Sequence, residues 1–128
     1  MATWEDVERI TASLPGLEQT PGKREWQVRG RPVAWHRVLQ PHDLDALEGP
    51  PAGDALAVRV PDMAEQKALT EGSVEGAFNI PHFTRRPIVL VDLERVGRDT
   101  LAELITDGWA TQAPKSVVAR WMGENQTR

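Results

Sequence analysis

Residues 25–39 constrain the fold more than any other stretch, because they predict two strands joined by a very short turn. Glu25–Val28 alternates polar and apolar residues, which is typical of a half-buried strand. Arg29–Pro32 supplies a glycine at a turn position, and Val33–Leu39 continues as a second strand. Strands joined so tightly are antiparallel neighbours, since parallel strands need a long crossover. The sequence therefore predicts a β-hairpin within an antiparallel sheet.

The other predicted elements do not alternate regularly between strand and helix. Ala55–Val60 is expected to be a third strand, and the β-branched run Ile88–Val91 is typical of a central one. Helices are predicted over Trp4–Leu14, Asp62–Gly72, Thr100–Trp109 and Lys115–Met122, with a single helical turn considered at Asp43–Leu47. A parallel sheet would need more regular alternation. We therefore expect an α+β fold in which an antiparallel sheet is packed with helices, in the order α-β-β-β-α-β-α-α.

Capping residues and apolar spacing predict how these helices begin and which side they bury. Thr3 and Asp6 are expected to cap the first helix. The pairs Asp62 with Glu65, and Thr100 with Glu103, have the spacing of capping boxes. The buried faces are expected at Ala64, Ala68 and Leu69 in the second helix, and at Leu101, Leu104, Ile105 and Trp109 in the third.

Length and composition limit the class of protein. A chain of 128 residues fits one domain, spanning 1–128, that can bury a core without cross-links. Cysteine is absent, which excludes disulfides and thiolate catalysis. The N-terminus is acidic and does not resemble a signal peptide, and the longest apolar run, Ile88–Val91, is too short to span a membrane. A cytoplasmic location without membrane association is expected.

Charge is distributed unevenly along the chain, although the net charge is −4. Residues 23–40 hold five basic side chains and one acid, whereas residues 41–80 hold two basic side chains and eight acids. The basic side chains of the hairpin region are Lys23, Arg24, Arg29, Arg31 and Arg37. A projecting hairpin with arginines at its tip can lie along a phosphate backbone. Alternatively, these charges are a solvated strand edge that discourages edge-to-edge pairing.

A second set of candidates surrounds the predicted central strand. His82 precedes the pair Arg85 and Arg86, and the three together could hold an anion. Alternatively, Pro81-His82 only shapes a turn. Trp26 and Trp35 lie among basic residues, where an exposed ring could stack on a nucleic-acid base, although large aromatic side chains more often lie in the core.

No pattern in the sequence indicates catalysis, a cofactor or a metal. His36, His42 and His82 lack the spacing of metal-binding pairs. Glycine-rich phosphate loops and the Gly-x-Ser-x-Gly elbow are absent. We therefore expect no metal, no cofactor and no enzymatic activity.

The ordered set of segments resembles the MmcQ/YjbR-like family along nearly the whole chain. The segments are Trp4–Gly16, Trp26–Arg31, Leu56–Val60, Pro81–Phe83, Val91–Leu93, Leu101–Trp109 and Ala113–Lys115. The resemblance implies a compact YjbR-like (CyaY-like) α+β fold and a "double wing" arrangement that is described as DNA-binding. It places Arg29-Gly30-Arg31 at the first hairpin and Arg85-Arg86 near the second, and it supplies no catalytic residues.

Two functions remain open at this point. The first is a nucleic-acid-binding module that contacts DNA phosphates, without sequence specificity, through the hairpin arginines and Arg85-Arg86. The second is a small-molecule or protein-binding domain without catalytic activity, with a cleft between the sheet and residues 81–87 to which His82 and Trp35 contribute. In either case we expect a monomer or a weak homodimer.

Overall fold

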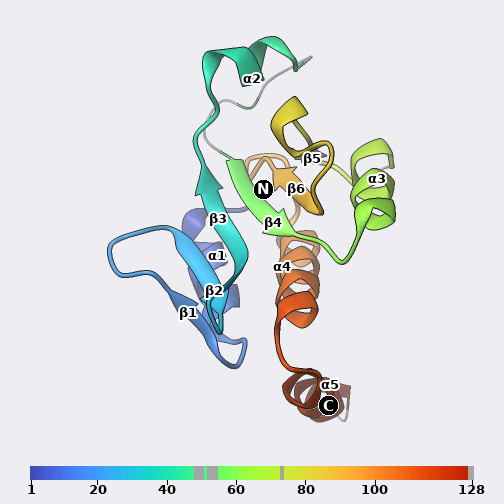
Figure 1. The fold of residues 1–128 in the computed structure, drawn as a ribbon. Coiled ribbons are helices and arrows are strands. Elements are labelled where there is room, and N and C mark those ends of the chain that lie inside the picture. The colour runs from blue at the N-terminus through green and yellow to red at the C-terminus, as the bar shows by residue number, and fades with distance from the viewer. Residues whose placement is uncertain (48–50, 52–54, 73, 127–128) are drawn as a thin grey trace.

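A computed structural model describes residues 1–47, 51, 55–72 and 74–126. The strands are β1 (Leu17–Gln19), β2 (Glu25–Val28), β3 (Arg31–Arg37), β4 (Ala55–Arg59), β5 (Ala77–Phe78) and β6 (Ile88–Val91). The helices are α1 (Trp4–Ala12), α2 (Pro41–Asp45), α3 (Met63–Glu71), α4 (Arg98–Gln112) and α5 (Lys115–Gln126), with a 3-10 turn at Pro81–Phe83. Figure 1 shows their arrangement.

The strands form one antiparallel sheet in the order β1-β2-β3-β4-β6-β5. This confirms the predicted α+β fold with an antiparallel sheet. The predicted order of elements is present, but β1, β5 and α2 are additional to it. Both additional strands lie at the edges of the sheet and are only two or three residues long, which is too short for an alternating pattern to reveal.

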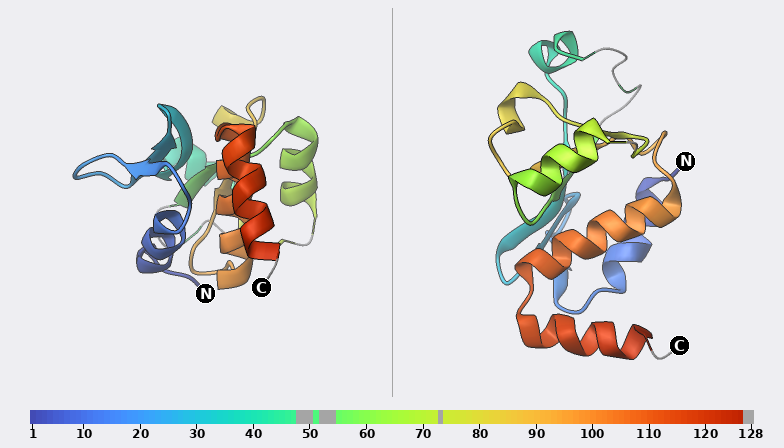
Figure 2. Two further views of the ribbon diagram at one scale, coloured as in Figure 1. Left: turned by 90° about the horizontal axis from the view of Figure 1, so that it is seen from below. Right: turned by 90° about the vertical axis from the view of Figure 1, so that its right-hand side faces the viewer.

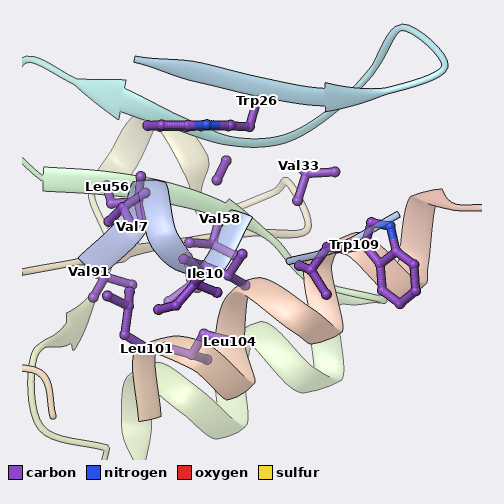
Figure 3. Packing of buried hydrophobic residues seen from close by; sticks show 14 of the residues in the cluster. Val7, Ile10, Trp26, Val33, Leu56, Val58, Val91, Leu101, Leu104 and Trp109 are labelled. Carbon is purple, nitrogen blue, oxygen red and sulfur yellow. The ribbon is translucent and has the colours of Figure 1, made fainter. Parts of the chain in front are cut away.

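The two sides of the sheet are packed differently. Alternate residues of β4 and β6, such as Leu56, Val58 and Val89, face a large core that includes residues of α1 and α4. The intervening residues, such as Ala57 and Leu90, face a smaller cluster with Ile80 and Phe83. Figure 2 shows α4 between α1 and α3, and Figure 3 shows the large core between the sheet and the helices. Among the described residues, no helix is long and apolar enough to cross a membrane.

The first helix begins as predicted. The hydroxyl of Thr3 accepts a hydrogen bond from the N–H of Asp6, and the carboxylate of Asp6 accepts one from the N–H of Thr3. Asp6 also pairs with Arg9 and with Arg98 at the start of α4. The Arg9 bond, followed by the Thr3 bond and the charge of Arg98, lowers the pKa of Asp6 below its ordinary value of 3.8. One carboxylate therefore caps α1 and links it to α4.

The buried face predicted for the helix at 62–72 is wrong in part. Asp62 caps α3 as expected and Leu69 packs against the large core, but Ala64 and Ala68 are exposed, and the buried side chain of the helix is Gln66. The side-chain amide of Gln66 lies within hydrogen-bonding distance of three backbone carbonyls, those of Phe83, Arg86 and Ile88. A buried amide is favourable where it satisfies backbone groups. Gln66 thus anchors the loop before β6, a role that the apolar pattern could not indicate.

The start predicted for the helix at 100–109 is also wrong, while its buried face is confirmed. The helix begins at Arg98 after Gly97, so Thr100 lies in its first turn and is not the cap. Leu101, Leu104, Ile105 and Trp109 are all buried. The indole N–H of Trp109 donates to the carbonyl of Pro15 at 2.8 Å, so this side chain connects α4 to the end of α1.

Trp109→Ala is expected to lower the free energy of unfolding by about 3–5 kcal/mol, because it removes a fully buried ring and leaves a cavity. Chemical denaturation measures the loss. Trp109→Phe, which keeps an aromatic ring but not the N–H donor, should lose less. An unchanged denaturation midpoint for Trp109→Ala would show that this end of the core contributes little to the stability of the fold.

Asp6→Asn tests the charge of Asp6, because asparagine can still accept the hydrogen bond from Thr3. The lowered pKa means that the ionised carboxylate stabilises the fold above about pH 4, and that this stabilisation disappears as the pH falls through the folded-state pKa. The variant should therefore melt at a lower temperature than wild type at pH 7, and the difference should shrink in acid. A difference that stays constant between pH 7 and pH 3 would contradict this account.

Candidate nucleic-acid interface

The turn between β2 and β3 holds an arginine in an unfavourable backbone conformation. Arg29 has φ 53° and Gly30 has φ 77°, so both central residues of the two-residue turn are left-handed. This is the geometry of a type I′ turn, which asparagine or glycine usually occupies at the first position. A side chain such as arginine is strained there. Arg29 is the one described residue other than glycine that has a positive φ.

Arg29 and Arg31 border a groove between this turn and the junction of α4 and α5. The groove has a volume of about 570 Å³, and the residues that line it are Arg29, Arg31, Ala110, Thr111, Gln112, Ala113, Pro114 and Lys115. No carboxylate is among them. Arg29, Arg31 and Lys115 are exposed, and none of the three forms an ion pair with another described residue. We call this surface the basic groove.

A hydrogen bond between residues far apart in the sequence stabilises the basic groove. The side-chain amide of Gln112, the last residue of α4, donates to the carbonyl of Pro32 at 3.0 Å. This bond fixes the start of β3 beside the start of α5. Lys115 was not among the residues predicted for the site. Nothing in the local sequence around Ala113-Pro114 indicates that Lys115 lies beside a hairpin more than 80 residues earlier.

The other basic residues of the hairpin lie at its opposite end. Lys23 and Arg24 precede β2, and Arg37 ends β3. Lys23 is exposed, whereas the guanidinium of Arg24 lies 4.5 Å from the ring centroid of Trp4. The five predicted hairpin residues therefore do not form one patch: two lie at the turn and three lie at the far end of the strands.

Arg37 has a structural role, because its side chain is bound within the fold. Its guanidinium lies 3.3 Å from the carboxylate of Asp43 and 5.4 Å from the ring centroid of Phe83. The Asp43 side chain is only 1% exposed. Burial raises the pKa of this carboxyl, but the Gln40 N–H and the charges of His42 and Arg37 outweigh it, so the pKa is lowered overall. Arg37 and Asp43 thus join β3 to α2, and Arg37 is a poor candidate for contacting DNA.

Arg85 and Arg86 lie at the same end of the sheet as Arg29 and Arg31. Register places Ile88 opposite Arg59 at the end of β4, and the start of β3 lies on the other side of that strand. Arg85 and Arg86 are exposed and form no ion pair among the described residues. Three strand spacings separate β2 from β6, so the distance between these two strands is about 14 Å.

Acidic residues occupy the space between α3 and α4. Burial raises the pKa of Asp107 on α4, and the nearby carboxylates of Glu65 and Glu103 raise it further. Asp107 lies four residues before Thr111, which lines the basic groove. Three carboxylates therefore lie close together on this side of α4.

The cleft predicted between the sheet and residues 81–87 is filled by side chains. Phe83 and Ile80 are buried there with Ala57 and Leu90. His82 is exposed, and its ring lies 4.7 Å from that of Phe83. Trp26 is buried in the large core, whereas Trp35 is half-buried. The structure does not bring His82 into the hollow that Trp35 lines.

That hollow lies on the hairpin itself, on the side away from α1 and α4. It has a volume of about 430 Å³, and the residues that line it are Glu25, Trp26, Gln27, Gly30, Pro32, Ala34 and Trp35. Figure 1 looks onto this side of β2 and β3, where no described helix covers them. We call it the hairpin hollow.

The histidines lie apart from one another. His36 packs its ring against Trp4 at 5.2 Å, and His42 lies 3.4 Å from Asp43. In the part of the chain that the structure describes, no three His, Asp or Glu side chains are grouped as a metal site requires.

Comparison with known proteins finds three similar proteins in mycobacteria. They are "Uncharacterized protein Mb2600" of Mycobacterium bovis, and "Uncharacterized protein MT2646" and "Uncharacterized protein Rv2570" of two strains of Mycobacterium tuberculosis. Each is 40% identical over 130 residues, covering 98% of this chain and 99% of the relative. No family model matches the sequence. No solved structure matches it either.

Arg29→Asn is expected to raise the free energy of unfolding by up to about 1 kcal/mol, because asparagine tolerates the left-handed conformation better than arginine does. Denaturant titration measures the gain. Arg31→Asn is the matched control: it removes the same charge from the next strand position, which does not have a positive φ. Equal effects of the two substitutions would mean that the backbone of Arg29 is not strained.

Proposed function

We propose that this chain, which belongs to the family of the mycobacterial proteins Mb2600, MT2646 and Rv2570, binds DNA phosphates without sequence specificity through the β2–β3 turn and the basic groove. The observation that carries the proposal is the groove: Arg29, Arg31 and Lys115 border it, none of them forms an ion pair with a described residue, and the described residues that line it include no carboxylate. Such a cluster attracts phosphate oxygens, and arginine can contact two of them at once.

The strain at Arg29 supports a functional reading of the turn. Asparagine or glycine would occupy that position with less strain, so a long cation there costs stability. Residues held in unfavourable conformations cluster at functional sites. An arginine that served only solubility could lie at any exposed position without that cost.

The position of Arg85 and Arg86 supports contacts on two sides of one duplex. They directly precede β6, which lies about 14 Å from β2 across the sheet, and this spacing is comparable to the width of about 12 Å of the DNA major groove. This arrangement is consistent with the double-wing description of the MmcQ/YjbR-like family, which the sequence resembles. Neither basic segment is a helix that could enter the groove and read base edges. Binding to duplex DNA should therefore depend on phosphates alone.

The alternative function, a small-molecule or protein-binding domain, has one observation in its favour. The hairpin hollow is of the size that small ligands occupy, and its lining includes Trp35 and Pro32.

Binding to short duplexes across a salt series tests the proposal. With three to five phosphate contacts, log affinity should fall with log salt concentration at a slope of about −3 to −4.5, and the dissociation constant should lie in the range of about 10⁻⁴–10⁻⁶ M. Arg29→Ala with Arg31→Ala should weaken binding to all sequences alike and flatten the slope by about two. Fluorescence anisotropy with two unrelated duplexes measures both effects.

Lys67→Ala with Arg95→Ala is the matched control, because it removes two exposed cations outside both basic segments. If the control weakens binding as much as the turn variant does, the effect is one of net charge and not of this site. The absence of any binding by wild type at low salt would leave the ligand-binding alternative ahead.

A further inference from the structure

The hairpin hollow has one aromatic side and one polar side. Register places Glu25 opposite Trp35 and Gln27 opposite Pro32, so β3 contributes the flat indole of Trp35 and the apolar ring of Pro32, and β2 contributes two polar side chains. The proposed phosphate binding uses none of these four residues. Their arrangement is that of a site for a planar group with hydrogen-bonding atoms at its edge.

Trp35 is held in place from behind. Its ring meets the buried ring of Phe83 edge-on, with centroids 6.5 Å apart and an interplanar angle of 77°. Trp35 is also half-buried against the smaller core cluster, so its orientation is fixed while part of the side chain lines the open hollow. A ring fixed in this way can stack on a ligand at little cost in conformational entropy.

The polar side of the hollow offers one donor and one acceptor. The side-chain oxygen of Gln27 accepts a hydrogen bond from the hydroxyl of Thr20 at 3.0 Å, and its amide nitrogen is a donor with no acceptor among the described residues. Glu25 is exposed and has no ion pair among the described residues. Its carboxylate can accept a hydrogen bond from an amino group.

Cations flank the hollow at both ends of β2. Lys23 lies just before β2 at one end of the hollow, and Arg29 and Arg31 follow at the turn at the other end, where Gly30 lines the hollow. The four residues of β2 span about 13 Å, at ~3.4 Å per residue. A chain with negative charges on either side of a planar group is therefore complementary to the hairpin.

We propose that the hairpin hollow holds one unpaired base of a single-stranded nucleic acid, stacked on Trp35, with the neighbouring phosphates on the cations at the two ends of β2. This inference rests on the proposed phosphate binding and specifies the form of nucleic acid. A base within a duplex is paired and stacked, so it cannot enter the hollow. The carboxylate of Glu25 favours bases with an amino group, such as cytosine, over thymine.

Oligo(dC), oligo(dT) and a duplex of equal length test the inference at one salt concentration. The protein should bind oligo(dC) more tightly than the duplex, and about fivefold more tightly than oligo(dT). Trp35→Ala should weaken binding to oligo(dC) by about five- to a hundred-fold, the range measured for base–aromatic stacking, while Trp35→Phe should lose less.

Glu25→Gln keeps the test valid if Trp35→Ala does not fold. Because Glu25 is exposed, this variant should fold normally, and the ratio of its affinities for oligo(dC) and oligo(dT) should fall towards one. Glu8→Gln on α1 removes an equal charge away from the hairpin and should leave the ratio unchanged. The ratio is the informative quantity, since removing any acid strengthens binding to all polyanions.

Outcomes that overturn the inference differ from those that overturn the proposed function. Equal binding of oligo(dC), oligo(dT) and duplex, insensitive to Glu25→Gln but weakened by the Arg29 and Arg31 substitutions, would disprove the base site and leave phosphate binding intact. Deoxycytidine, which has no phosphate, isolates the hollow. A shift of the Trp35 indole NMR signal on adding this nucleoside is expected, and the absence of a shift would overturn the base site.

Discussion

The close approach of α4 to the sheet at Gly108 is the constraint on which the rest of the structure depends. A Cβ atom at this position would lie 2.8 Å from the carbonyl oxygen of Arg59 and 3.2 Å from a methyl group of Val58, so only glycine allows the helix this close to β4. The next residue, Trp109, fills the space beside it and bonds to Pro15. Together these residues determine where α4 lies relative to β3, β4 and the end of α1.

The proposed binding surface is a consequence of that packing. Because α4 is fixed on the sheet, its last residue, Gln112, reaches the carbonyl of Pro32, and α5 begins beside the β2–β3 turn. The turn is therefore braced from one side while Arg29 is held in a strained conformation. Stability built in the core offsets strain at the surface, as is usual where function requires an unfavourable residue.

The sequence predicts those elements of the fold that depend on local or periodic patterns of residues. The hairpin predicted at 25–39, the Thr3–Asp6 cap and the buried face of α4 depend on neighbours within a few residues, and all three are present, although the second strand of the hairpin is Arg31–Arg37. The short edge strands β1 and β5 have too few residues to show a pattern. Gln66 and Lys115 act through partners about twenty and more than eighty residues away, and no local pattern encodes such contacts. The filling of the predicted cleft by Phe83 likewise depends on tertiary packing.

The most direct test of the account is an NMR titration of the ¹⁵N-labelled protein with a short single-stranded oligonucleotide. We expect the backbone signals of residues 23–35, of the first turn of α5 and of Arg85-Arg86 to shift. The signals of α1 should stay unchanged. We also expect the Trp35 indole signal to shift. Shifts concentrated on α2 or α3, with the hairpin signals unchanged, would contradict the assignment of binding to this surface.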